Sequence, residues 1–235
     1  MTVSKPDLSH LDLSHLDLSH IDTWVFDLDN TLYPASANLF PQIDARMKAF
    51  ISTLLDIDAD AAFTIQKQYY HEYGTTMRGL MIHHQVDPIA FMDYVHDIDH
   101  SVLHPDPHLK DIIDALPGRR LIHTNGSKQH AIGVLTALGI KDCFEAIFDI
   151  QAGNFIPKPD PDSYQRFLTS HVFEPSTAIM FEDSVKNLKP AAELGMVTVL
   201  VQHESNAAST NPDEHCHYVT EDLTAWLRYA TEASS

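Results

Sequence analysis

The stretch that decides the fold lies near the N-terminus and reads Thr23-Trp24-Val25-Phe26-Asp27-Leu28-Asp29-Asn30-Thr31. Its first half is aromatic and β-branched, which favours a buried strand. The strand then meets two carboxylates, Asp27 and Asp29, which leave the same face because they lie two residues apart. Like charges held that close repel, so one must gain a proton or a cation must lie between them. A carboxylate pair that grips a hard metal ion explains this pattern, and so does a strand end followed by an Asx-type turn.

The residues after this strand have helical periodicity. Apolar side chains recur at helical spacing between residues 39 and 51, and a second helix is predicted from Ala59 to Tyr73. A third helix follows Asp87-Pro88, because proline suits the first helical turn. The intervening segment from Gly74 to Leu80 is interpreted as a hydroxyl-rich turn. This periodicity therefore predicts that residues 38–100 form an all-helical unit inserted after the first strand.

The second half of the chain alternates between strands and helices. Short strands are predicted at about residues 120–124, 144–150, 177–181 and 196–201. Such alternation is typical of a parallel sheet with helices on both faces. The predicted fold is α/β, a Rossmann-like, doubly wound parallel sheet with an inserted all-helical cap domain. The predicted domains are a core of residues 21–37 and 101–235, a cap of residues 38–100, and a poorly ordered tail of residues 1–20 that contains a threefold Asp-Leu-Ser-His repeat.

Polar residues follow four of the predicted buried segments. They are Asp27 and Asp29, then Thr124 and Asn125, then Lys158 between two prolines, then Glu182 and Asp183. Each group alone has an ordinary explanation as a turn, a solvated loop or a helix N-terminus. Four of them in sequence at one sheet edge favour a ligand site, because ligands bind at the carboxyl ends of parallel strands. Carboxylate oxygens of this kind suit Mg²⁺.

The composition excludes several classes of partner. The formal net charge of −18 argues against binding to nucleic acid polymers and to anionic membranes. The two cysteines, Cys143 and Cys216, are too few and too far apart for a disulfide framework or a zinc finger. No apolar run approaches the ~18 residues of a membrane span. The reducing cytoplasm is the expected compartment.

Four ordered motifs now point to a family. They are Asp27-Leu28-Asp29-Asn30-Thr31, Leu121-Ile122-His123-Thr124-Asn125-Gly126, Lys158-Pro159 and Phe181-Glu182-Asp183-Ser184. This ordered set resembles the haloacid dehalogenase-like hydrolase superfamily over roughly residues 21–225, and the helical insertion resembles its mobile cap. Thr31-Leu32-Tyr33-Pro34, together with residues 73–80 of the cap, is similar to the pyrimidine 5′-nucleotidase branch.

The resemblance implies a Mg²⁺-dependent phosphatase that works through an aspartyl phosphate. Asp27 would be the nucleophile, and Asp29 the general acid and then the general base. Mg²⁺ would be held by Asp27, the backbone carbonyl of Asp29 and Asp183, with Glu182 binding it directly or through water. The phosphoryl oxygens would be bound by Thr124, the backbone around Asn125, and Lys158, which neutralises charge.

The resemblance leaves the substrate open. A nucleoside monophosphate such as UMP or CMP is the expected small phosphorylated metabolite, and Tyr33 and Arg78 are candidate substrate contacts. Arg78 could equally be a surface ion-pair partner. Other possibilities are a phosphatase for phosphoglycolate or a sugar phosphate, a phosphomutase, and a binding protein on an inactive scaffold. A dehalogenase is disfavoured because such enzymes typically lack the second Asp of the first motif, here Asp29.

Overall fold

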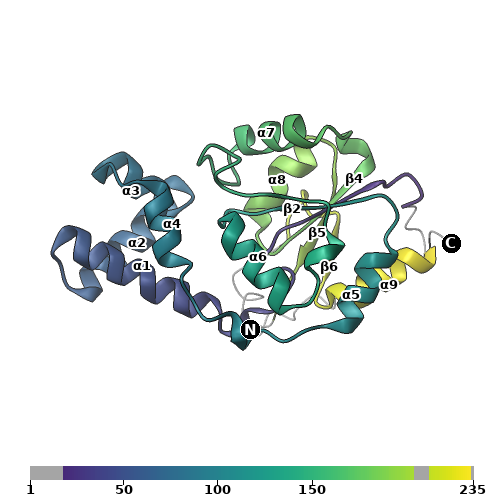
Figure 1. Cartoon of the computed structure of the whole chain (residues 1–235). Coiled ribbons are helices and arrows are strands. Elements are labelled where there is room, and N and C mark those ends of the chain that lie inside the picture. Colours follow the sequence, from purple (N-terminus) through teal and green to yellow (C-terminus); the bar gives the residue numbers. More distant parts are fainter. Residues whose placement is uncertain (1–17, 204–211, 234–235) are drawn as a thin grey trace, which may run out of the picture.

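The computed structural model describes residues 18–203 and 212–233, which form a parallel sheet flanked by helices and a separate group of four helices (Figure 1). The strands are β1 Thr23–Phe26, β2 Arg119–His123, β3 Ala146–Phe148, β4 Ala178–Glu182, β5 Val197–Val201 and β6 Tyr218–Thr220. The α-helices are α1 Phe40–Leu55, α2 Ala59–Tyr73, α3 Thr76–His84, α4 Pro88–Val95, α5 Pro107–Ala115, α6 Lys128–Ala137, α7 Pro161–His171, α8 Val185–Glu193 and α9 Leu223–Ala233. Short 3-10 helices cover Ala35–Ala37, His100–Val102, Lys141–Cys143 and Pro175–Thr177. Within the described ranges, no helix has both the length and the apolar character that crossing a membrane requires.

Strand β1 lies in the interior of the sheet. The strand order is β3-β2-β1-β4-β5-β6, and all neighbouring strands are parallel. Phe26, the last residue of β1, is in register with Ile122 of β2 and Phe181 of β4. The polar residues that follow these three strands therefore meet at one edge of the sheet. The predicted α/β fold with a doubly wound parallel sheet is confirmed.

The side chains of β1 alternate between two apolar layers. Trp24 and Phe26 pack with α5, α6 and α9, whereas Val25 packs with α7 and α8 on the other face. The ring of Phe26 stacks on that of Phe181 with 4.8 Å between centroids. Because β1 is buried on both faces, every residue of this strand is apolar or, like Thr23, hydrogen-bonded. Asp27, the next residue, is thereby held at the end of a rigid element.

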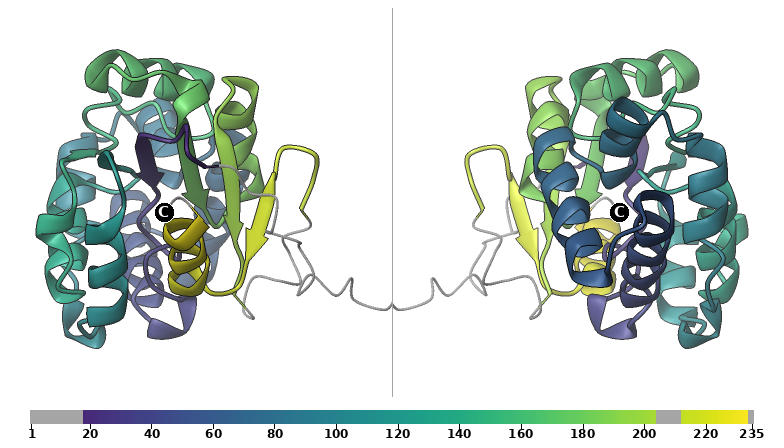
Figure 2. Two further views of the ribbon diagram at one scale, coloured as in Figure 1. Left: turned by 90° about the vertical axis from the view of Figure 1, so that its right-hand side faces the viewer. Right: turned by 90° about the vertical axis from the view of Figure 1, so that its left-hand side faces the viewer.

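Helices α1–α4 have an apolar cluster of their own. It includes Ile43, Ile51, Leu80 and Phe91, which are buried. In the right-hand view of Figure 2 these helices, in blue, lie in front of the sheet. Their position between β1 and β2 in the chain supports our proposed division into a core of residues 21–37 and 101–235 and a cap of residues 38–100.

The segment from Gly74 to Leu80 is mostly helical, and its interpretation as a turn was wrong. Gly74 ends α2 with a φ of 81°, a conformation that glycine adopts without strain. Thr75 then begins α3, since its side chain accepts a hydrogen bond from the N–H of Arg78. The turn occupies only two residues, and Met77 and Leu80 are buried on the helix that follows.

The N-terminal repeat lies largely outside the described residues, which begin at residue 18. The end of its third copy is part of the core, contrary to the predicted tail of residues 1–20. Leu18 is buried in the main apolar cluster, and its carbonyl accepts a hydrogen bond from the N–H of Ile21. The physical reason is that the leucine of this copy reaches the apolar layer that covers Trp24.

Candidate active site

Lys158 is the centre of the group of polar residues at the sheet edge. Its side chain is buried, and its Nζ donates hydrogen bonds to Asp27 Oδ1 at 2.8 Å and to Glu182 Oε2 at 2.6 Å. A third bond goes to the carbonyl oxygen of His123 at 2.7 Å, at the end of β2. The structure thus brings together residues from all four predicted motifs. The ion pairs hold the nucleophile candidate Asp27 in one orientation.

Asp27, Glu182 and Asp183 form a cluster of carboxylates that fits a divalent cation. Each offers an oxygen, and these atoms lie within 4.8 Å of one another. Burial, together with repulsion from Glu182, raises the pKa of Asp27 to about 7 despite the nearby Lys158. Burial likewise raises the pKa of Glu182 to about 7 and, together with repulsion from Asp27, that of Asp183 to about 6. One ammonium group, paired with only two of these three carboxylates, leaves excess negative charge, which a Mg²⁺ ion would offset.

Asn125 and Thr124 shape the loop that follows β2. The amide of Asn125 makes two bonds with the backbone of Lys158, donating to its carbonyl at 3.1 Å and accepting from its N–H at 2.8 Å. Thr124 Oγ1 accepts a hydrogen bond from the N–H of Gly126. The side chain of Asn125 therefore positions Lys158. The backbone of Asn125 and the side chain of Thr124 remain the proposed phosphate contacts.

Asp29 has a different environment from Asp27. Its Oδ1 accepts a 2.5 Å hydrogen bond from the hydroxyl of Tyr33 and lies 2.8 Å from Nε2 of His130. Burial acts to raise the pKa of Asp29, but His130 and Tyr33 outweigh it and lower the pKa to about 2. Tyr33 was predicted as a substrate contact. It is 3% exposed and its hydroxyl donates to the carboxylate four residues earlier, and its role as a substrate contact stays a prediction.

His130 is a site residue that the sequence reasoning missed. It is buried in the first turn of α6, whose N-cap is Ser127. The signal available in the sequence was its place three residues after that cap, in the helix that follows the Thr124-Asn125-Gly126 loop. A single histidine among the sixteen of the chain carried no marker of this contact.

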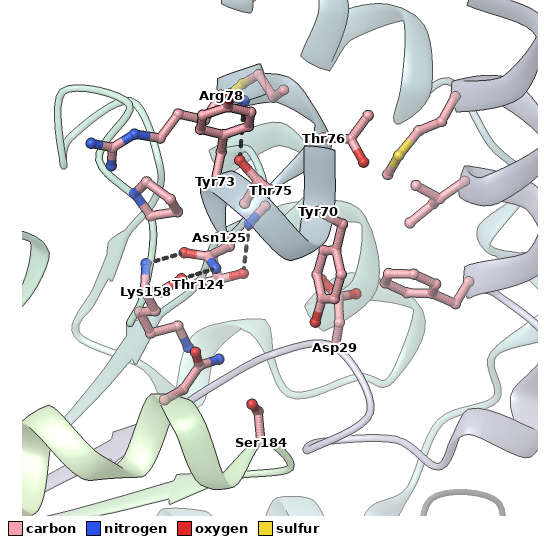
Figure 3. A pocket seen from close by; sticks show the side chains of 18 of the residues that line it. Asp29, Tyr70, Tyr73, Thr75, Thr76, Arg78, Thr124, Asn125, Lys158 and Ser184 are labelled. Carbon is pink, nitrogen blue, oxygen red and sulfur yellow. Dashed lines mark hydrogen bonds between the residues drawn. The ribbon is translucent and has the colours of Figure 1, made fainter. Parts of the chain in front are cut away.

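A cavity of about 1120 Å³ lies between the cap and the core, with Asp27, Asp29, Lys158 and Asp183 in its wall. Figure 3 shows Tyr70, Tyr73 and Arg78 of the cap across from Asp29 and Lys158 of the core. The guanidinium of Arg78 is 3.1 Å from Asp160 Oδ2, so the predicted substrate contact is also an ion pair between cap and core.

Comparisons with known proteins agree with this geometry. A family profile described as haloacid dehalogenase-like hydrolase matches residues 21–195. Phosphate metabolism protein 8 of Saccharomyces cerevisiae is 31% identical over 193 residues, which are 74% of this chain and 60% of that protein. The chain thus spans less than two thirds of this relative. Glyceraldehyde 3-phosphate phosphatase of Methanocaldococcus jannaschii is 26% identical over 85% of this chain and 92% of that protein.

The fold has solved counterparts. A HAD phosphatase from Thermococcus onnurineus has a TM-score of 0.62 at 17% identity, covering 89% of this chain and 98% of that one. At this identity the likeness shows the fold alone. The profile match covers most of the chain and includes all four motifs, so the protein belongs to the haloacid dehalogenase-like hydrolase family.

Proposed function

We propose that the protein is a Mg²⁺-dependent phosphatase that hydrolyses a small phosphomonoester, most specifically a pyrimidine nucleoside 5′-monophosphate such as UMP or CMP. The observation that carries this proposal is the bridge made by Lys158 between Asp27 and Glu182, beside Asp183. It supports the proposal because a candidate nucleophile, a fixed positive charge and candidate cation ligands lie together at one point of the cavity.

The first step is attack by a carboxylate oxygen of Asp27 on phosphorus. The bond between phosphorus and the leaving oxygen breaks, and an aspartyl phosphate forms. Lys158 remains charged at neutral pH, because its contacts with Asp27 and Glu182 raise its pKa above the usual value and outweigh its burial. It therefore offsets charge on the phosphoryl oxygens throughout the step. A bound Mg²⁺ would supply further charge neutralisation, held by Asp27, the backbone carbonyl of Asp29 and Asp183, with Glu182 binding directly or through water.

Asp29 moves the protons. With its pKa at about 2 it is an ionised carboxylate in this structure, the form that accepts a proton from the water attacking the aspartyl phosphate. In the first step the same carboxyl passes a proton to the leaving oxygen. A phosphomonoester with a second pKa of about 6 can bring that proton in with it. The different environments of Asp27 and Asp29 thus separate the nucleophile from the acid and base.

The cavity supports a nucleotide as the substrate. Its volume of about 1120 Å³ leaves room for a nucleoside beyond the phosphate. On the cap side the wall includes the apolar side chains of Phe40, Met47 and Met92 and the aromatic ring of Tyr70. Gln66 in the same wall is buried, and its Oε1 has no hydrogen-bond partner in the described part of the chain. A flat base with a polar edge matches such a wall.

A phosphatase for another small ester is the second candidate. The relative from Methanocaldococcus jannaschii is named for glyceraldehyde 3-phosphate and matches over nearly its whole length. A phosphomutase would use the same core residues. We place both below the nucleotidase because of the size of the cavity and the composition of its cap wall. We also keep the cytoplasm as the expected location, from the two free cysteines.

The proposal is tested by phosphate release from UMP, CMP, AMP, GMP, phosphoglycolate and sugar phosphates, each with Mg²⁺ and with EDTA. We expect preference for UMP and CMP and loss of release in EDTA. Metal-dependent release from another ester would retain the mechanism and reject the nucleotide. No release from any of them by folded protein would contradict the phosphatase assignment.

Metal binding should depend on pH. The pKa of Asp27 and Glu182 at about 7 and of Asp183 at about 6 lie above their usual values, so these groups bind more protons in the folded than in the unfolded chain. Without metal, their contribution to stability is therefore present in acid and is lost as pH rises from about 4 through 7. We expect Mg²⁺ to raise the unfolding temperature more at about pH 8 than at about pH 5.5, where it must displace protons.

The measurement is thermal unfolding with Mg²⁺ and with EDTA at both pH values. Asp183→Asn should reduce the Mg²⁺-induced rise, whereas Asp114→Asn, at the surface pair with Lys110, should leave it unchanged. A rise that is equal at the two pH values would show that Mg²⁺ does not bind at this cluster.

A further inference from the structure

Asp29 is held through only one of its two oxygens. Oδ1 receives both the hydroxyl of Tyr33 and Nε2 of His130, at 2.5 and 2.8 Å. No hydrogen bond reaches Oδ2 from the residues that the structure describes. Oδ2 lies beside Gly126, where an added Cβ would be 3.6 Å away. Two donors on one oxygen prevent the carboxylate from rotating, so the other oxygen faces the loop of the proposed phosphate contacts.

His130 is buried and packs against the end of the cap. His130 is 1% exposed. Its ring stacks on the ring of His96, with centroids 4.3 Å apart and planes 12° from parallel. His96 follows α4, the last helix of the cap, and its Nδ1 lies 2.9 Å from Oγ of Ser127. Ser127 is the N-cap of the helix that carries His130. His96 is thus tied to the same helix that it covers.

The orientation of the His130 ring follows from these contacts. Nε2 faces the carboxylate of Asp29, and Nδ1 is buried without a hydrogen-bond partner among the described residues. The ring therefore makes a single polar contact, to the oxygen that Tyr33 also bonds. A buried imidazole that served the packing of α6 alone would need no polar partner on the cavity side, and an apolar residue would fill its place at lower cost.

We propose that His130 is the positioning residue of Asp29, and that His96 holds the His130 ring in place from the end of the cap. His130 fixes Oδ1 so that Oδ2 exchanges the proton with the leaving oxygen and then with water. His130 itself touches neither. This role rests on the proposed function and adds to it a residue outside the four motifs. The stacked rings of His96 and His130 then link the cap to Asp29, the proton-transferring group.

The test compares His130→Leu with His130→Gln. Glutamine can present its side-chain N–H where Nε2 stands, whereas leucine removes the donor. With the best nucleotide or sugar phosphate substrate and Mg²⁺, we expect His130→Leu to lower kcat by about 10²-fold with little change in KM, because proton transfer is impaired and binding is not. His130→Gln should recover most of this loss. His108→Leu, at an exposed histidine, is the matched control and should behave like the wild type.

A second substrate separates proton transfer from folding. The leaving group of p-nitrophenyl phosphate needs no proton, so His130→Leu should keep the initial burst of nitrophenolate and lose only the slower steady-state rate. Tyr33→Phe removes the other donor without creating a cavity and should shift both substrates in the same sense by a smaller factor. His96→Ala should do likewise, because it leaves the His130 ring free to tilt.

The results that would overturn the inference are distinct from failure of the proposed function. Equal losses of burst and steady-state rate, equal rates for His130→Gln and His130→Leu, or a raised KM at unchanged kcat would each show that His130 does not position Asp29. Should His130→Leu not fold, the same comparison made with Tyr33→Phe and His130→Gln decides the matter. A wild-type protein that releases phosphate from neither substrate overturns the phosphatase assignment, and the positioning role with it.

Discussion

Asp27→Asn should abolish phosphate release while leaving the fold intact. An amide cannot form the acyl phosphate, so we expect kcat to fall by about 10⁴-fold or more. The fold should tolerate the change, because burial already disfavours the charged form and raises the pKa of Asp27 to about 7. Lys158 would keep its bonds to Glu182 and to the carbonyl of His123.

The measurements are steady-state phosphate release and acid-quench trapping of labelled phosphate on the protein. The wild type should retain label during turnover, and Asp27→Asn should not. Asp114→Asn, a change of the same type at an exposed ion pair, should remain active. Full activity of Asp27→Asn would remove Asp27 from the nucleophile role, once intact mass has shown that the new amide has not deamidated.

Lys158→Met should cost both activity and stability. It removes the cation from between Asp27 and Glu182, which lie in a site where Lys158 is 1% exposed. Breaking a buried ion pair on one side typically costs about 3–5 kcal/mol. The two carboxylates must then take up protons to remain buried, so the variant should lose stability as pH rises through neutrality. We expect kcat to fall by about 10³-fold or more through lost charge stabilisation.

A double variant separates the two effects. Lys158→Met combined with Glu182→Gln removes one of the stranded charges, so it should recover part of the free energy of unfolding and none of the activity. Lys189→Met, at an exposed pair with Glu193, is the control and should stay within about 0.5 kcal/mol of the wild type. If Lys158→Met unfolds like the wild type in urea across this pH range, the ion pairs at Lys158 do not hold the site together.

The core of the site was predictable because its residues follow buried strands in an order that parallel sheets bring to one edge. The register of β1 with β4 sets Asp27 beside Glu182, and the loop held by Asn125 brings Lys158 between them. The Asp27-Leu28-Asp29 motif alone left a metal site and a turn as alternatives, and the polar residues that follow later strands favoured the site. Patterns of two or more residues at strand ends therefore predicted the fold and most of the cluster around Lys158.

What the sequence did not reveal depends on contacts between distant segments. His130 meets Asp29 across 101 positions of chain, and no local pattern encodes such a contact. Most of the predicted turn is the start of α3, because the side chain of Thr75 caps a helix in a hydroxyl-rich segment whose sequence also favours a turn. The three-residue strand β6 pairs with β5 through backbone hydrogen bonds. Its short sequence resembles that of many loops and does not predict a strand. Likewise, the sequence around Tyr33 gave no sign that its hydroxyl would bond Asp29.

The interior position of β1 also determines when the candidate site can form during synthesis of the chain. Its two partner strands begin at Arg119 and Ala178, so the apolar strand leaves the ribosome long before either of them exists. Helices α1–α4 are nearly consecutive in the chain and pack on one another. They can therefore fold before β1 has a partner strand. Pairing over such separations is slow and leaves strand edges open to other chains. A nascent chain that ends between His123 and Ala178 can pair β1 with β2 but leaves its other edge open, so β1 is the segment that a chaperone would have to shield.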